Sequence, residues 1–201
     1  RYENLYDPLG IMPELQPDRV LVAPASAHAQ GVELSANRTV GPWTWWASYS
    51  LSEVTDRIDG REEPRSWDQR HSLQAGFAWS NEKWNFSAAT SVRSGWPTSS
   101  LELFDLGVDA EGEPLYEAVP GPRNAERLPG FASVDMRLSR RFDLPRGSLL
   151  AFIEVSNLTN RRNVCCIDWD VDDGDNGELS LEHSLDYWMP LLPAIGVLWE
   201  F

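Results

Sequence analysis

Seven stretches of the chain alternate between apolar and polar side chains with a period of two residues. In residues 43–52, Trp43, Trp45 and Ala47 fall on one side of an extended chain, opposite Thr44, Trp46 and Ser48. A period of two is typical of β-strands that have one apolar and one polar face. The seven stretches are residues 31–39, 43–52, 71–79, 84–95, 131–142, 148–156 and 194–201. The pattern therefore predicts an all-β protein.

The lengths of the stretches and of their connections narrow the fold class. Most stretches have about nine to eleven residues, which suits a tilted strand that crosses a bilayer and exceeds the five or six residues common in soluble sheets. Short connections at residues 40–42, 80–83 and 143–147 alternate with long ones at residues 53–70, 97–130 and 157–193. Outer-membrane barrels alternate short periplasmic turns with long extracellular loops. The prediction is an antiparallel transmembrane β-barrel segment of about seven to eight strands, the eighth beginning before residues 1–6.

Aromatic residues gather at the ends of the predicted strands. Those beside the short turns and the C-terminus are Trp43, Trp79, Trp84, Phe142, Trp199 and Phe201, and those near the long connections are Tyr49, Trp96, Phe131 and Trp188. Aromatic side chains concentrate at both interfaces of a membrane. Two girdles are therefore predicted, and the alternative is that these residues form the core of a soluble sandwich.

Composition and charge exclude several other classes. No apolar run reaches the roughly 18–20 residues of a membrane helix. The net charge of −14, with 17 Lys and Arg against 31 Asp and Glu, disfavours a nucleic-acid partner. The only close Ser/His/Asp grouping is Asp68, His71 and Ser72, and adjacent residues of a strand point to opposite faces. No catalytic residue, no enzymatic activity and no cofactor are expected.

Asp168, Asp170 and Asp172 are weak candidates for a metal site. Alternating carboxylates resemble a calcium loop, but Asp173 and Leu179 stand where such a loop needs Gly and Glu. A solvated acidic loop is the favoured interpretation.

Cys165 and Cys166 are adjacent, a spacing that fits neither a zinc site nor a CxxC redox pair. In an exported protein they could form a strained vicinal disulfide, and two free thiols are the alternative.

Four charged residues fall at polar positions of the predicted strands: Arg93, Asp135, Arg137 and Glu154. In a barrel these positions face the lumen. There the side chains could contact a plug or a ligand, and the favoured interpretation is that they form ion pairs with one another.

Several stretches, taken in order, resemble the end of TonB-dependent outer-membrane receptors. They are residues 30–34, 68–73, 93–98, 127–137 and 152–161, and the resemblance covers nearly the whole chain. Gly196, Trp199 and Phe201 resemble the terminal signal of outer-membrane barrels, which the barrel-assembly machinery would recognise by strand addition.

The resemblance implies that residues 1–201 are the C-terminal portion of a roughly 22-stranded barrel around a plug. The signal peptide, the plug and the TonB box would then lie outside this chain. The implied function is a receptor of the bacterial cell outer membrane that binds a scarce siderophore, cobalamin, glycan or similar ligand and transports it with TonB-derived energy.

The implied partners are outer-membrane lipid and lipopolysaccharide, the barrel-assembly machinery, the TonB complex and a small-molecule ligand. Two alternatives are a soluble carbohydrate-binding β-sandwich and a porin-like or structural outer-membrane barrel.

Overall fold

The computed structural model describes residues 24–108, 114–173 and 179–201, and all regular structure in these ranges is β-strand. No helix with the length and hydropathy of a membrane span occurs in the described ranges. The half-strand predicted at residues 1–6 lies outside them.

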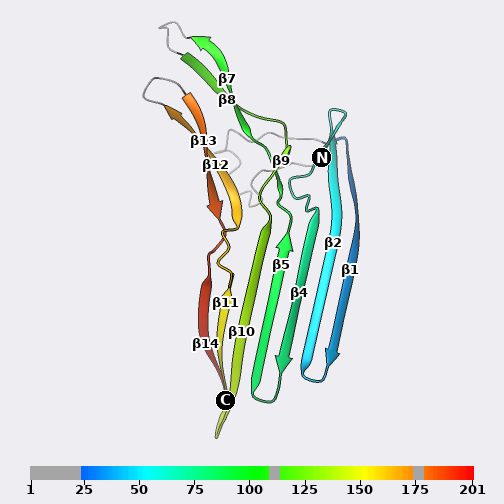
Figure 1. The fold of residues 1–201 in the computed structure, drawn as a ribbon, viewed down its shortest axis with the longest axis vertical. Helices are drawn as coiled ribbons and strands as arrows, with labels where there is room; N and C mark the ends of the chain where they lie inside the picture. Colours follow the sequence, from blue (N-terminus) through cyan, green and yellow to red (C-terminus); the bar gives the residue numbers. More distant parts are fainter. Residues whose placement is uncertain (1–23, 109–113, 174–178) are drawn as a thin grey trace.

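Seven long strands form one antiparallel sheet in the order β1-β2-β4-β5-β10-β11-β14 (Figure 1). They are β1 (Ser26–Val40), β2 (Trp43–Ile58), β4 (His71–Ser80), β5 (Trp84–Arg93), β10 (Phe131–Leu144), β11 (Gly147–Ser156) and β14 (Leu192–Glu200), and β3 (Arg61–Pro64) adds to β2. Each predicted stretch corresponds to one long strand, so the all-β, antiparallel prediction is confirmed. The sheet is open, with β1 and β14 at its edges, and the described residues form no closed barrel.

The connections alternate between the two ends of the sheet, as predicted. The strand pairs β1-β2, β4-β5 and β10-β11 are joined by turns of two or three residues at one end. In the first of these turns Gly41 has a φ of 56°, a conformation that a side chain would strain. The long connections all leave from the opposite end (Figure 1).

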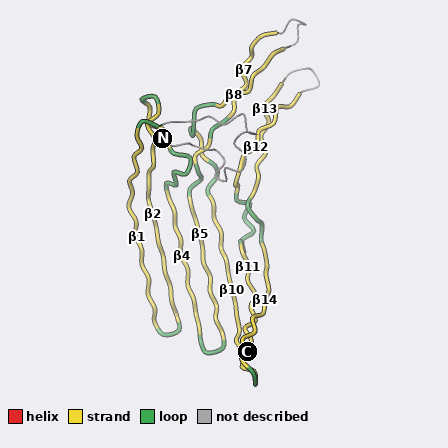
Figure 2. The backbone as a smooth tube through the Cα atoms, turned by 180° about the vertical axis from the view of Figure 1, so that it is seen from behind, coloured by secondary structure: helices red, strands yellow, loops and turns green. Residues whose placement is uncertain are grey.

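The long connections contain strands that the sequence analysis did not predict. β7 (Leu101–Val108) pairs with β8 (Pro114–Pro120), and β12 (Val164–Asp173) pairs with β13 (Leu179–Tyr187). A two-residue ladder joins β6 (Pro97–Thr98) to β9 (Glu126–Arg127). The two hairpins project beyond the end of the sheet (Figures 1 and 2). The interpretation of the acidic run with Asp168, Asp170 and Asp172 as a solvated loop was therefore wrong, because ladder hydrogen bonds to β13 hold these residues in a strand.

The strand register gives the sheet one apolar face and one polar face. The apolar face carries, at alternate positions, Val32, Leu34, Trp43, Trp45, Leu51, Leu73, Phe77, Ala88, Val92, Val134, Met136, Leu138, Leu149, Ile153, Ile195, Val197 and Trp199. The polar face carries Ser35, Trp46, Ser48, Gln74, Ser87, Ala89, Ser91, Ser133, Asp135, Arg137, Ser148 and Glu154. Because every strand pair is in register, the period-two patterns of all seven strands add up to one continuous surface.

Within residues 24–108, 114–173 and 179–201, the main sheet is a single layer without a hydrophobic core. No hydrophobic side chain of the described residues is buried. The most buried side chains are instead polar, and they lie at the end of the sheet from which the long connections leave: Asp56, Asp68, Asn124, Asn157 and Asn163. None of the described residues therefore covers the apolar face of the sheet.

Candidate functional site

A row of aromatic rings borders the apolar face at the end with the short turns. The ring centroid of Trp43 lies 6.2 Å from that of Trp79 and 6.5 Å from that of Phe77. Further along, the guanidinium of Arg140 lies 4.9 Å from the ring centroid of Trp84 and 4.8 Å from that of Phe142. Trp199 and Phe201 extend the row at the edge strand, with centroids 5.5 Å apart. The six aromatic residues predicted for this end thus lie together.

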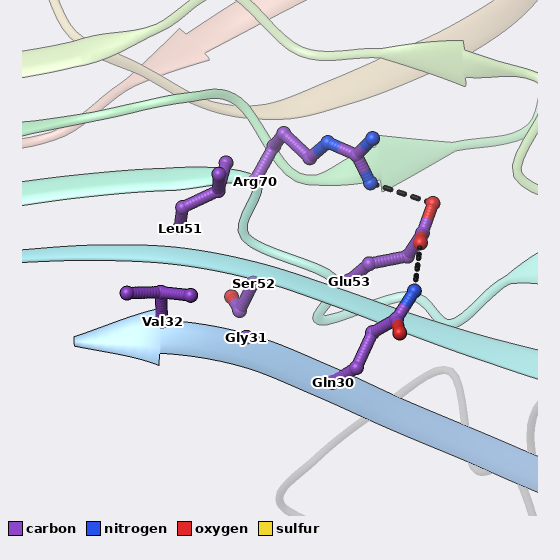
Figure 3. Close-up of a pocket in the computed structure, with 7 residues that line it drawn as sticks. All are labelled: Gln30, Gly31, Val32, Leu51, Ser52, Glu53 and Arg70. Carbon is purple, nitrogen blue, oxygen red and sulfur yellow. Dashed lines mark hydrogen bonds and ion pairs between the residues drawn. The ribbon is translucent and has the colours of Figure 1, made fainter.

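The opposite end of the apolar face is bordered by polar side chains. Glu53 accepts a hydrogen bond of 2.9 Å from Gln30 and one of 2.6 Å from Arg70, beside a hollow of about 330 Å³ (Figure 3). The hydrogen bond from Arg70 and, to a smaller extent, the one from Gln30 lower the pKa of Glu53. The same contact with Glu53 raises the pKa of Arg70. Tyr49 and His71 are joined by a hydrogen bond of 2.8 Å. The apolar face thus ends in a band of hydrogen-bonded polar groups.

The second predicted girdle is not a single row. Phe131 is opposite Arg93 in the register and therefore lies on the polar face, whereas Tyr49 lies on the apolar face. The guanidinium of Arg93 lies 4.2 Å from the ring centroid of Phe131 and 5.3 Å from that of Trp96. The prediction was wrong for Phe131 because side chains alternate along β10. Phe131 therefore points to the same face as Asp135, and Val134 points to the opposite, apolar face.

The four charged residues predicted to share a face all lie on the polar face. Arg137 donates a hydrogen bond of 2.9 Å to the directly opposite Glu154. Asp135 instead accepts hydrogen bonds from the Ser133 hydroxyl at 2.9 Å and the Asn157 backbone amide at 2.8 Å. The predicted mutual ion pairing therefore holds for Arg137 and Glu154, while Arg93 stacks on aromatic rings and Asp135 fixes the end of β11.

A hollow of about 320 Å³ lies on the polar face next to this charged group. It is lined by Trp46 on one side and by Asp135, Arg137 and Glu154 on the other. The sequence placed Trp46 among polar neighbours but gave it no role. The signal that would have identified it is Gly76, which stands directly opposite Trp46 in the register and leaves room for the indole.

Buried ion pairs and hydrogen bonds fix the segments that leave the sheet. Asp68 is 2% exposed, accepts a hydrogen bond of 2.7 Å from the Val54 amide and forms an ion pair with Arg127. Asn124, also buried, donates to the Pro64 carbonyl at 2.7 Å. Because Asp68 is engaged with Arg127, and His71 with Tyr49, the Ser/His/Asp grouping of the sequence is not assembled. The sequence analysis missed the Asp68–Arg127 contact, which joins residues 59 positions apart.

The candidate metal ligands Asp168, Asp170 and Asp172 lie on β12. Successive residues on one side of a strand are about 6.6 Å apart, whereas the oxygen ligands of one Ca²⁺ lie within about 5 Å of one another. An extended strand therefore does not wrap around an ion as a calcium loop does. Within the described ranges, no group of three or more His, Cys, Asp or Glu is placed to hold a metal.

Cys165 and Cys166 are free thiols on β12. The register shifts between Val164 and Cys166, and such a bulge re-aims side chains that would otherwise point to opposite faces. A hydrogen bond with the Cys165 side chain, then burial and the nearby charges of Cys165, Asp186 and Asp168, raise the pKa of Cys166 to about 11.

The raised pKa predicts slow alkylation of Cys166. At pH 9 a thiol with the usual pKa of 9.0 is half ionised, whereas one with a pKa of about 11 is about 1% ionised. Iodoacetamide labelling of Cys166, followed by mass spectrometry, should therefore be tens of times slower in the folded protein than in urea. The folded state holds this proton more tightly, so its contribution to stability is complete below pH 9 and is lost as the pH rises towards 11.

The variant Cys165→Ala is the matched control for the labelling. It removes the first cause of the shift, so labelling of Cys166 in the folded protein should accelerate. Equal rates for folded and unfolded wild-type protein would contradict the raised pKa.

Of the predicted assembly signal, Gly196 and Trp199 lie on the edge strand β14, and Phe201 directly follows this strand. Gly196 lies on the polar face beneath the ring of Phe152, where a Cβ would approach Cζ to 2.3 Å, so no larger residue fits there without displacing the ring. Trp199 lies on the apolar face opposite Leu149, and the Phe201 side chain is exposed. The arrangement leaves alternate side chains of an unpaired edge accessible, and recognition by assembly machinery stays a prediction.

Comparisons with protein-family models, with curated proteins and with solved structures found no match to this chain.

Proposed function

We propose that this chain forms part of the wall of a β-barrel in the bacterial outer membrane, and that its protein is a TonB-dependent receptor that imports a scarce ligand. The observation that carries the proposal is the uncovered apolar face, which extends over seven strands with its larger side chains exposed. Soluble monomers rarely expose a contiguous apolar patch of more than a few hundred Å². A bilayer is a surrounding in which such a face is stable.

The dimensions and borders of the apolar face suit a bilayer. On β2 its positions run from Trp43 to Leu51, which is about 27 Å along the strand. The apolar band of outer-membrane barrels is about 25 Å tall and has aromatic residues at its interfaces. The aromatic row at one border and the polar group around Glu53 and Arg70 at the other agree with two interfaces.

The arrangement favours a barrel wall over a soluble sandwich. A sandwich packs a second sheet against the apolar face. Among the described residues the further sheets are the two-residue ladder β6-β9 and the hairpins β7-β8 and β12-β13. The two hairpins extend past the end of the main sheet and do not cover its face (Figure 1). The exposed ladder edges of β1 and β14 would pair with further strands, since unpaired backbone groups are costly in lipid.

Cell fractionation tests the location. We expect the complete gene product to sediment with outer membranes and to require detergent for extraction, because the apolar face needs a lipid or detergent cover. A monomer that remains soluble without detergent would rule out the barrel wall. Ligand uptake that disappears when TonB is deleted would distinguish an importer from a porin-like barrel, whose transport is independent of TonB.

A further inference from the structure

We propose that the hollow on the polar face is a subsite for one ring of a neutral oligosaccharide. Trp46 would stack on the sugar ring, and Asp135, Arg137 and Glu154 would bind its hydroxyl groups. The proposal rests on the proposed function, because in a barrel wall the polar face lines the path of the ligand.

The indole of Trp46 lies over Gly76, the residue directly opposite it on β4. A Cβ on Gly76 would come within 2.9 Å of Nε1 and 3.0 Å of Cε2 of the indole, so the ring occupies the space above this glycine. The side chain nevertheless stays 39% exposed. The indole is therefore positioned over the backbone of Gly76 while part of its surface stays open to a ligand ring, as stacking requires.

The indole of Trp46 and the charged group lie across a floor of small residues. Trp46, Gly76, Ala89 and Asp135 form one cross-strand row, and Ala78, Ser87, Arg137 and Glu154 form the next. The indole extends from β2 over β4, and β5 lies between β4 and β10. About two strand spacings, or about 10 Å, therefore separate the indole from β10. The resulting volume of about 320 Å³ is at the small end of the range for ligand pockets.

The charges of the hollow favour a neutral, hydroxyl-rich ligand. Two carboxylates and one guanidinium line it, which disfavours an anion. The bond from Arg137 to Glu154 uses one of the five donors of the guanidinium and fixes both side chains without ligand. The guanidinium also lies 4.0 Å from the ring centroid of Phe152. The hollow thus has donors and acceptors on one side and the indole of Trp46 on the other, a combination that suits the alternating C–H and O–H groups of a sugar ring.

Calorimetric titration of the complete gene product in detergent tests the subsite, with maltohexaose, cellohexaose and chitohexaose as probes. We expect at least one of them to bind, and Trp46→Ala to weaken its binding at least tenfold. Trp46→Phe keeps a flat aromatic ring, so it should weaken probe binding less than Trp46→Ala does.

Trp45→Ala is the matched control, because Trp45 is the neighbouring residue on the apolar face, and it should bind as the unchanged protein does. Circular dichroism of each variant checks that the sheet is intact. Binding by none of the three probes, or equal effects of Trp45→Ala and Trp46→Ala, would overturn the proposal. A negative result in the location or uptake experiment would reject the importer, but the titration would still measure Trp46-dependent binding. The two proposals can therefore be rejected independently.

Discussion

The variant Arg127→Ala is expected to lower the free energy of unfolding by about 3 kcal/mol. Its partner Asp68 is 2% exposed, so the truncation leaves a carboxylate buried without its counter-charge. Removing one partner of a buried ion pair costs about 3–5 kcal/mol. The lower end applies because the Arg127 side chain is itself 37% exposed and water screens part of the interaction. Urea unfolding of the protein refolded into lipid vesicles measures the change.

Two further variants give this prediction its control. The ion pair of Arg137 with Glu154 has side chains that are 41% and 39% exposed, so Arg137→Ala should change stability by no more than about 1 kcal/mol. Combining Arg127→Ala with Asp68→Asn removes the uncompensated charge and should recover part of the loss. Equal effects of Arg127→Ala and Arg137→Ala would show that the buried contact does not hold the long connections to the sheet.

The strands and faces of the main sheet were predictable because the period of a strand depends only on local sequence. Leu73 and Phe77 are four positions apart, so the alternation of a strand already places them on one face. In-register pairing then places the apolar positions of each strand beside those of its neighbours, so seven separate patterns become one apolar face. This is why the positions of Trp43, Trp79 and Trp199 followed from the sequence.

The hairpins beyond the sheet were not predictable from their pattern. β12 contains Asp168, Asp170 and Asp172, and such an acidic segment looks like a solvated loop when only its hydropathy is considered. What holds it is pairing with β13, whose contacts lie up to 23 residues away in the sequence. The bulge at Cys165 is likewise a property of the pairing and not of either strand alone.

The Asp68–Arg127 contact and the position of Trp46 over Gly76 could not be predicted from the sequence for a related reason. The contact of Asp68 with Arg127 joins two long connections, and the indole of Trp46 has its place because Gly76 stands opposite it on the next strand. Neither relation is visible until the register is known. Of the four charged residues grouped from the sequence, only Arg137 and Glu154 pair, since they alone are directly opposite each other.

The two neighbouring alanines of β5 should respond very differently to arginine. Ala88 is opposite Phe77 and Met136 on the apolar face, whereas Ala89 is opposite Gly76 and Asp135 on the polar face. If the apolar face contacts lipid, Ala88→Arg places a guanidinium near the middle of the bilayer. The expected loss of stability is about 2–4 kcal/mol.

Ala89→Arg should cost much less, because its guanidinium enters the polar hollow beside the carboxylate of Asp135. The pair of variants shares one strand, one depth and one chemical change, so only the facing differs. Reversible urea unfolding in lipid vesicles compares them directly. A larger loss for Ala89→Arg would invert the assignment of lumen and lipid faces, and equal losses would mean that neither face of β5 contacts a membrane.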